Sequence, residues 1–256
     1  MIKYSEQNTK IKNLRHVAGL APYLEGGKKI YSLDLLSGIA CPGAKDCKSM
    51  AIVGVDGKKT IKDGPSTLFR CFSASQEVLF PAVYNLRKSN LDQLQACKYT
   101  FPMYDLLMAA LPSDAGIVRI HVGGDMFSLA YLRAWILLAR TYPKVLFYFY
   151  TKSLHFLRVI HNEGGCKNLS KGIILDNLLV TASYGGVFDR LIPELGIRTA
   201  QVVYSEGGAL PIDHDDSHAA TSGGDFALLI HGTQPKNSVA SIALSTIKKG
   251  LKNANV

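Results

Sequence analysis

Three cysteines in the first third of the chain could hold a metal. Cys41 and Cys47 lie six positions apart, and Cys71 follows farther downstream. Three thiolates can bind an iron–sulfur cluster or, together with a fourth ligand, zinc. On a four-iron cluster they would leave one iron open for a substrate or cofactor. Buried or free thiols are the alternative, and we expect this incidental role for Cys97 and Cys166.

A second group of candidates follows a predicted buried strand at residues 117–122. Gly123, Gly124 and Asp125 come directly after it. Glycines let a backbone approach a ligand closely, and α/β proteins bind ligands beyond the carboxyl ends of their strands. We therefore predict that this segment contacts a ligand. The alternative is a tight turn with Asp125 near a helix N-terminus, where the helix dipole favours a carboxylate.

Residues 212–218 contain a third group of candidates. Asp213, His214, Asp215, Asp216 and His218 combine three carboxylates with two imidazoles. This composition suits a divalent metal or acid–base chemistry. An acidic loop that caps a helix is the alternative. We take Asp213, His214 and Asp216 as candidate catalytic residues.

Three further candidates, Lys152, Glu206 and His231, follow other predicted strands. Lys152 could pair with a phosphate or carboxylate, Glu206 is a candidate base, and His231 could reach the same site. A capping loop with an exposed lysine is the alternative for Lys152. His121 either points into the site or is a core histidine.

The elements that would position these residues alternate regularly along the chain. Apolar segments predict strands at residues 29–36, 117–122, 145–150, 178–182, 200–204 and 226–230, with helices near 128–141, 155–162, 187–194 and 238–249. Near-continuous apolar strands are typical of a parallel sheet covered on both faces. Because the strands end in polar or glycine residues, we predict an α/β fold with a partial (β/α)6 TIM-like barrel. A flat doubly wound sheet is the alternative.

Between the first two of these strands, residues 50–55 and 58–61 predict a small β-hairpin, inside an insertion at about 42–70. One helix is predicted from Ser73, with Pro81 near its first turn, and another at about 104–111. We expect residues 1–28 to form an N-terminal arm and residues 29–256 to form a single barrel-like domain.

The chain has 256 residues, a formal net charge of +9 and 47% hydrophobic residues. These values fit a globular protein with a sizeable core. We find no apolar stretch long enough for a membrane span and no signal peptide, so we expect a cytoplasmic protein. Five cysteines, an odd number, argue against a disulfide framework. The positive charge permits binding of a nucleic acid or an anionic small molecule, although it also fits a solubilising surface.

Several segments together resemble the phage gene product 88 family, which occurs in phages and bacterial genomes. They are CPGA (41–44), RCFSASQE (70–77), RIHVGGDMFS (119–128), YTK (150–152), IDHDD (212–216) and IHGTQ (230–234). The resemblance extends from about residue 28 to residue 250. It implies a protein of a bacterial or phage-infected cytoplasm, but it defines no reaction.

The cysteines and the Gly-Gly-acid segment are also similar to those of radical S-adenosylmethionine enzymes. In that family three cysteines bind a [4Fe-4S] cluster whose open iron chelates S-adenosylmethionine, and a Gly-Gly-Glu motif contacts its amino group. The resemblance implies cluster ligands at Cys41, Cys47 and Cys71, and cofactor contacts at Gly123, Gly124 and Asp125. In this chain the third cysteine is distant, the acid is Asp, and Lys48 stands where an aromatic residue is usual.

Our first hypothesis is therefore an iron–sulfur, radical S-adenosylmethionine-like enzyme that acts on a nucleotide, a nucleic acid or another anionic substrate. The first alternative is a non-enzymatic, zinc-stabilised protein that binds nucleic acid or a host protein. The second alternative is a divalent-metal-dependent hydrolase or nuclease that uses residues 213–218.

Overall fold

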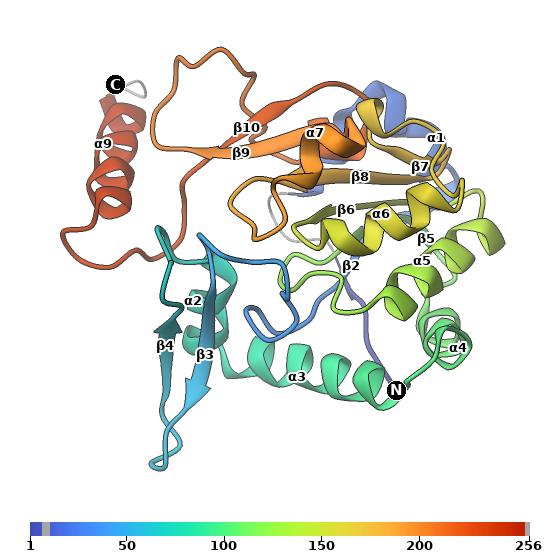
Figure 1. Ribbon diagram of the computed structural model, residues 1–256, viewed down its shortest axis with the longest axis horizontal. Coiled ribbons are helices and arrows are strands. Elements are labelled where there is room, and N and C mark those ends of the chain that lie inside the picture. The colour runs from blue at the N-terminus through green and yellow to red at the C-terminus, as the bar shows by residue number, and fades with distance from the viewer. Residues whose placement is uncertain (7–10, 254–256) are drawn as a thin grey trace.

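A mostly parallel β-sheet with helices forms the framework of the molecule (Figure 1). The computed structural model describes residues 1–6 and 11–253. Within these ranges, six parallel strands lie side by side in chain order: β2 (Lys29–Leu33), β5 (Ala115–Ile120), β6 (Leu146–Thr151), β8 (Leu178–Ser183), β9 (Thr199–Val203) and β10 (Phe226–Leu229). Each coincides with a predicted strand, so the α/β prediction is confirmed.

The order of these strands never reverses, and the sheet does not close. A doubly wound sheet reverses its strand order at one point, whereas here each parallel strand adds to the same side. In the described chain, residues 211–213 cover the outer edge of β10. The Asp213 N–H donates to the Ala227 carbonyl, and the Ala227 N–H donates to the Pro211 carbonyl, both at 2.8 Å. No closed barrel therefore forms there. The short antiparallel strands β1 (Ser5–Glu6) and β7 (Ile173–Leu175) pair with β2 and β8.

The helices that follow the hairpin and strands are α2 (Phe72–Leu79), α3 (Pro81–Ala96), α4 (Thr100–Ala110), α5 (Leu129–Thr141), α6 (Leu154–Asn162) and α7 (Leu191–Leu195). The predicted helix around Pro81 is two helices, because a residue before proline avoids the helical conformation. Proline suits the first position of α3, where a backbone N–H would have no partner. The predicted Ser128 cap is confirmed, since its hydroxyl accepts the Tyr131 N–H at 3.2 Å.

The two faces of the sheet belong to separate cores. Val118 and Ile120 of β5 join the helices in the larger core. Ile117 faces the other side, where it packs with Ile11 and Leu14 in a smaller core. Short elements on this side are η1 (Ile11–His16), η2 (Ala18–Leu20), α1 (Ala21–Leu24) and α8 (Ser217–Ala220). Two further short helices, η3 (Glu25–Gly27) and η4 (Leu169–Lys171), precede β2 and β7. The predicted arm therefore packs on the sheet, although residues 7–10, like 254–256, lie outside the described residues.

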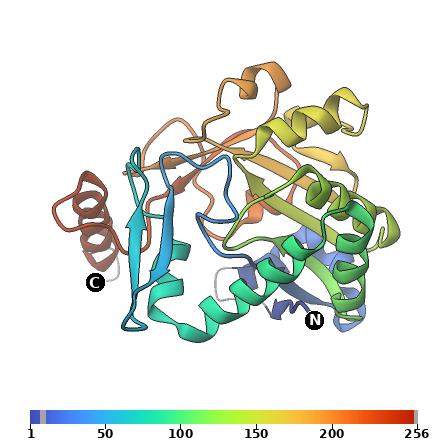
Figure 2. The same cartoon turned by 60° about the horizontal axis from the view of Figure 1, so that its bottom comes forward.

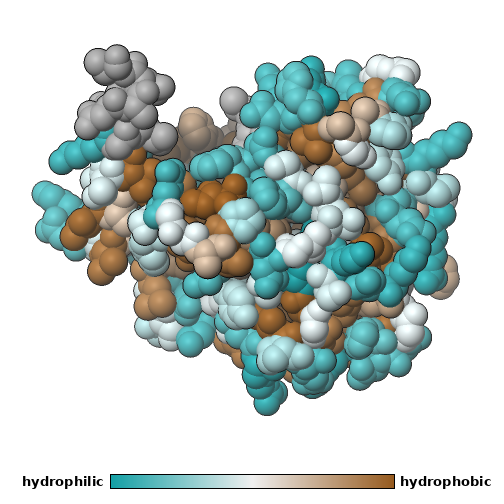
Figure 3. Space-filling model, turned by 90° about the horizontal axis from the view of Figure 1, so that it is seen from above, coloured by the Kyte–Doolittle hydropathy of each residue, from teal (hydrophilic) through white to brown (hydrophobic). Residues whose placement is uncertain are grey.

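The predicted hairpin is confirmed as β3 (Ser49–Val53) and β4 (Lys59–Asp63), which form a separate two-stranded sheet. The hairpin stands at the same end of the molecule as α9 (Val239–Asn253), away from α4 and α5 (Figures 1 and 2). The face seen from above mixes hydrophilic and hydrophobic residues (Figure 3). Among the described residues, we find no helix with the length and apolar character to cross a membrane.

Candidate functional site

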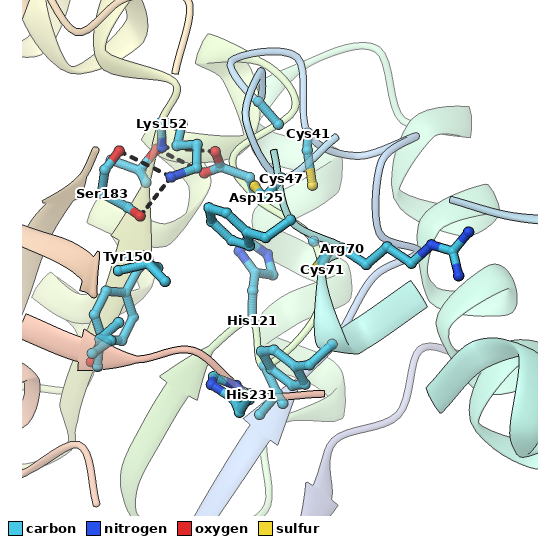
Figure 4. Close-up of a pocket in the computed structure, with 18 of the residues that line it drawn as sticks. Cys41, Cys47, Arg70, Cys71, His121, Asp125, Tyr150, Lys152, Ser183 and His231 are labelled. Atoms are coloured by element: carbon cyan, nitrogen blue, oxygen red, sulfur yellow. Dashed lines mark hydrogen bonds between the residues drawn. The ribbon is translucent and has the colours of Figure 1, made fainter. Parts of the chain in front are cut away.

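A cavity of about 500 Å³ opens at the carboxyl ends of the parallel strands, a volume typical of small-molecule sites. Figure 4 shows the cysteines and Tyr150 on opposite sides of it. The predicted residues that line it are Cys41, Cys47, Cys71, Gly124, Asp125, Lys152 and His231. Residues that the sequence predicts to share one site thus meet in this cavity, although they come from four distant parts of the chain.

The first two cysteines lie on a loop that crosses from the end of β2 to the end of β8. The Gly185 carbonyl accepts the N–H groups of Lys45 and Asp46 at 3.2 and 2.9 Å. Gly43 packs so closely on the loop after β6 that a Cβ there would be 2.2 Å from the Lys152 carbonyl oxygen. The glycines of both loops therefore permit the cysteine loop to dock on the strand ends.

Cys71 is positioned by the residues that follow the last strand. Gln234 accepts the Arg70 N–H at 2.8 Å and donates to the Arg70 carbonyl at 3.1 Å. Gly232 has a φ of +80°, and a Cβ there would be 2.7 Å from the Phe72 Cβ. The 230–234 motif thus holds the third cysteine at the cavity.

A buried ion pair ties together three segments that border the cavity. The Glu77 carboxylate has no exposed surface and accepts the Ser37 N–H and hydroxyl at 3.0 and 2.8 Å. Arg87 donates to Glu77 at 3.0 Å and to the Ser73 hydroxyl at 2.6 Å. Gly123 packs against this pair, since a Cβ there would be 2.1 Å from the Ser73 Oγ. Sequence reasoning missed this network because its members come from distant segments.

The carboxylate of Asp125 is almost fully buried and accepts four hydrogen bonds. Its four donors are the N–H groups of Met126 and Lys152 and the hydroxyls of Thr151 and Ser153, at 2.6, 2.9, 2.7 and 3.2 Å. Burial raises the pKa of this carboxyl, and these hydrogen bonds oppose the rise. Asp125 therefore joins the loops after β5 and β6, and the neighbouring Gly124 presents backbone to the cavity.

The ammonium group of Lys152 also forms hydrogen bonds within the protein. It donates to the Ser183 carbonyl and hydroxyl at 3.1 and 2.7 Å and to the Tyr184 carbonyl. These partners are uncharged, so the positive charge acts on nearby acids and opposes the rise that burial causes in the pKa of both Asp125 and Cys47. Lys152 thus balances negative charge at the cysteine side of the cavity.

The three thiols share one electrostatic environment. Burial raises the pKa of Cys41 well above its usual value, and Asp125, Cys71 and Cys47 raise it further. Burial also raises the pKa of Cys71 to about 12 and that of Cys47, where Lys152 opposes the rise. Such thiols, when free, are protonated and weakly nucleophilic. In the described chain no group of three or more His, Cys, Asp or Glu side chains is placed to hold a metal ion.

Four predicted catalytic residues do not line this cavity. Asp213 is 3% exposed, and its carboxylate accepts the N–H groups of Asp215 and Ala219 at 3.3 and 3.2 Å. His214 and Glu206 are exposed. The residues absent from the cavity lining are Asp213, His214, Asp216 and Glu206. The structure therefore separates them from the cysteines.

Asp216 lies beneath the cavity and supports its floor. Its carboxylate has no exposed surface, pairs with Arg119 and accepts the Tyr148 hydroxyl at 3.2 Å. Arg119 lines the cavity, and its guanidinium carbon lies 5.5 Å from the centre of the Tyr150 ring. Because an unpaired buried charge is strongly destabilising, Asp216 fixes the position of Arg119.

His121 and Tyr150 complete the floor. His121 is 4% exposed, has a φ of +71° and contacts the Tyr131 hydroxyl through Nε2 at 3.0 Å. Burial, aided by Arg119, lowers the pKa of His121 to about 3, so its imidazole is neutral. Sequence reasoning missed Tyr150, although alternation along β6 places Tyr148 and Tyr150 on one face.

His231 lies at the edge of the cavity. Its Nδ1 is 2.9 Å from the Leu229 carbonyl oxygen, and its ring pairs with that of Phe72, with 4.6 Å between ring centres. Fold and site together define an α/β protein with a cysteine-lined cavity at the carboxyl ends of a mostly parallel sheet.

The family model described as Gene product 88 matches residues 3–250. The chain belongs to this phage protein family, and the resemblance seen in its sequence motifs is confirmed. Comparison with curated proteins and with solved structures found no match.

Proposed function

We propose that the protein is an iron–sulfur enzyme in which Cys41, Cys47 and Cys71 hold a [4Fe-4S] cluster. The observation that carries this proposal is that the three cysteines line a single cavity. Bound iron would compensate the cost of forming thiolates in this buried setting.

We also propose that the sheet is a partial (β/α)6 barrel and that S-adenosylmethionine is the co-substrate. The sequential order of the parallel strands and the cavity at their carboxyl ends support this view. The cluster, when bound, would supply electrons to S-adenosylmethionine. The Gly124 backbone faces the cavity, Asp125 fixes the surrounding loops, and Lys152 favours the thiolate of Cys47. The net charge of +9 supports a nucleotide, nucleic acid or other anionic substrate.

Anaerobic reconstitution with iron and sulfide tests the cluster directly. We expect about four irons and four sulfides per chain and broad visible absorbance. Cys47→Ala should remove this absorbance, whereas Cys97→Ala, a cysteine that does not line the cavity, should retain it. Unchanged absorbance in Cys47→Ala would contradict the proposal. Equilibrium dialysis of the reconstituted protein with S-adenosylmethionine then tests the co-substrate separately.

The same metal analysis tests the predicted zinc-stabilised alternative. One zinc per chain without sulfide would assign the cysteines a structural role, and salt-sensitive retention on DNA or RNA would then support a binding protein. The predicted hydrolase would bind its metal through residues 213–218, and loss of metal-dependent activity in Asp215→Asn or Asp216→Asn would support it. In this segment Asp213 already accepts backbone hydrogen bonds and Asp216 pairs with Arg119, and this favours the iron–sulfur proposal.

A further inference from the structure

Most of the net charge lies on two segments at one end of the molecule. Residues 42–71, which contain the hairpin, carry six Lys or Arg against three Asp, and residues 231–249, which contain most of α9, carry three Lys and no Asp or Glu. Together these two segments hold +6 of the formal net charge of +9. The hairpin and α9 stand at the same end of the molecule (Figures 1 and 2), so this end presents a basic surface to solvent.

The lysines of this basic surface differ in their partners from cations elsewhere. On α3, Lys88 pairs with Asp92, and on α5, Arg133 pairs with Glu163. By contrast, four exposed lysines of the basic surface have no carboxylate partner in the part of the chain that the structure describes: Lys62, Lys236, Lys248 and Lys249. A surface that serves solubility intersperses both signs of charge, whereas an array of unpaired cations attracts a polyanion.

The hairpin and α9 both begin at the rim of the cavity. Gln234 accepts the Arg70 N–H at 2.8 Å and donates to the Arg70 carbonyl at 3.1 Å, which joins the segment after β4 to the segment before α9. The cations in the cavity lining outnumber its single carboxylate, that of Asp125; they are Arg70, Arg119 and Lys152. A polyanion attracted to the basic surface is therefore also attracted towards the cavity.

Aromatic rings line the cavity where the hairpin and α9 begin. Phe69 and Phe72 are partly exposed, and both line the cavity. The exposed His231 pairs its ring with that of Phe72, with 4.6 Å between ring centres. Unpaired bases stack on rings of this kind, and cations beside such rings are typical of proteins that bind single-stranded nucleic acid.

An anionic membrane fits this surface less well than a nucleic acid. The tip of the hairpin exposes Val55 but also Asp56, whose carboxylate anionic headgroups would repel. The exposed lysines lie instead along the length of the hairpin, at Lys58 and Lys62. This arrangement suits a strand that runs from the tip of the hairpin towards the cavity.

We infer that the hairpin and α9 form a docking surface for a single-stranded nucleic acid. Its phosphates contact the lysines, and its bases stack on the aromatic rings at the cavity rim. The inference deepens the proposed function by naming the substrate class, and it rests on that function only for the reaction beside the cysteines. Docking of the strand itself requires no cluster.

Fluorescence anisotropy of the full-length protein with a labelled twenty-nucleotide oligothymidylate tests the inference. With about four lysines on phosphates, we expect binding that weakens roughly fiftyfold between about 50 and about 200 mM salt. An abasic strand of the same length and a duplex should each bind at least about fivefold more weakly, because neither offers unpaired bases to the aromatic rings.

The double variant Lys62→Gln/Lys249→Gln should weaken strand binding by about tenfold and reduce its salt dependence, because it removes two phosphate contacts. Lys98→Gln/Lys144→Gln is the matched control. It removes the same charge from two exposed lysines, one just before α4 and one just after α5, away from the hairpin. It should change the affinity by less than about twofold.

Three results would each overturn the inference. They are equal effects of the two double variants, equal affinity for the base-bearing, abasic and duplex probes, and binding to vesicles of phosphatidylcholine and phosphatidylserine but not to the strand. Iron is measured in the same samples. Strand binding without iron would remove only the cluster proposal, and an iron-loaded protein that binds no strand would remove only this inference.

Discussion

Two regions of the molecule are rich in potential metal ligands, and the fold treats them in opposite ways. The cysteine segments direct Cys41, Cys47 and Cys71 towards a cavity. The segment at residues 213–218 turns its acidic side chains into the protein, where Asp213 caps the backbone of α8 and Asp216 pairs with Arg119. Residue type alone does not distinguish them. The difference is whether neighbouring donors already satisfy the side chain.

Among the substitutions that test this difference, Asp216→Asn should have the largest effect on the free energy of unfolding. It removes the charge that compensates buried Arg119, so we expect a loss of about 3–5 kcal/mol in the free energy of unfolding, measured by urea denaturation. Asp215→Asn changes a partly exposed residue of the same segment and should cost less than about 1 kcal/mol. Equal effects of the two substitutions would show that Asp216 has no special structural role.

Gly123→Ala should disturb the region around the cavity. Gly123 packs there against the Glu77–Arg87 pair, which ties together segments that border the cavity. The new Cβ would approach the Ser73 Oγ to 2.1 Å and the Arg87 Cζ to 2.9 Å. Overpacking of this kind costs about 1–3 kcal/mol, and displacement of Ser73 should also reduce iron incorporation. Gly208→Ala is the control, because nothing lies within 4 Å of a Cβ there. A Gly123→Ala protein with wild-type melting temperature and iron content would contradict the predicted packing.

Acidic pH should destabilise the folded protein, because it favours protonation of His121 at the floor of the cavity. Its pKa is about 3 in the folded protein and 6.5 in the unfolded chain, so the unfolded state binds more protons between these values. Stability contributed by His121 is present at neutral pH and decreases as the pH falls from 6.5 towards 3. Between pH 7 and pH 5 this amounts to about 2 kcal/mol.

Chemical denaturation at pH 7 and pH 5 measures this dependence. His121→Asn, which tolerates a positive φ, should lose about that much of the difference between the two pH values. His214→Asn removes an exposed histidine and controls for the substitution itself. If the wild type and His121→Asn have the same pH dependence, His121 is not buried in its neutral form.

Lys152→Gln should produce the smallest effect, on the reactivity of Cys47. Burial raises the pKa of Cys47 and Lys152 opposes this rise, so loss of Lys152 should slow alkylation of Cys47 in iron-free protein by at least about threefold. Cys166, whose pKa burial alone raises to about 11, serves as an internal control in the same sample. Mass spectrometry after iodoacetamide treatment measures both rates. Equal slowing of both cysteines would indicate a general change in structure.

Much of the fold could be predicted because local patterns specify it. The strands that became β5, β6, β8, β9 and β10 were found from short apolar runs with polar ends, and the hairpin β3–β4 was found from its turn at Asp56 and Gly57. The short strands β1 and β7 and the helix α8 were missed, since few residues give little periodic signal. The division at Pro81 depends on local backbone sterics that the apolar spacing does not show.

The glycine motifs were harder to interpret, because their partners are distant in sequence. We predicted that Gly123 and Gly124 bind a ligand, yet Gly123 packs on the Glu77–Arg87 pair, and Gly124, which lines the cavity, also packs closely on Leu35. Gly43 and Gly232 likewise permit the cysteine segments to dock on strand ends. A glycine motif indicates that another group packs closely on the backbone, but only the folded structure shows which group this is.

The sequence by itself determined the α/β class, the family and the cysteines that face the cavity, because apolar periodicity and residue chemistry are local properties. Only the tertiary structure decided that Asp125 and Lys152 are hydrogen-bonded within the protein and that Asp216 pairs with Arg119. It also decided that, among the described residues, one buried polar atom each of Tyr150 and His121 has no hydrogen-bond partner. The physical reason is that the availability of a polar group depends on its hydrogen-bond partners, and these come from segments far apart in the chain.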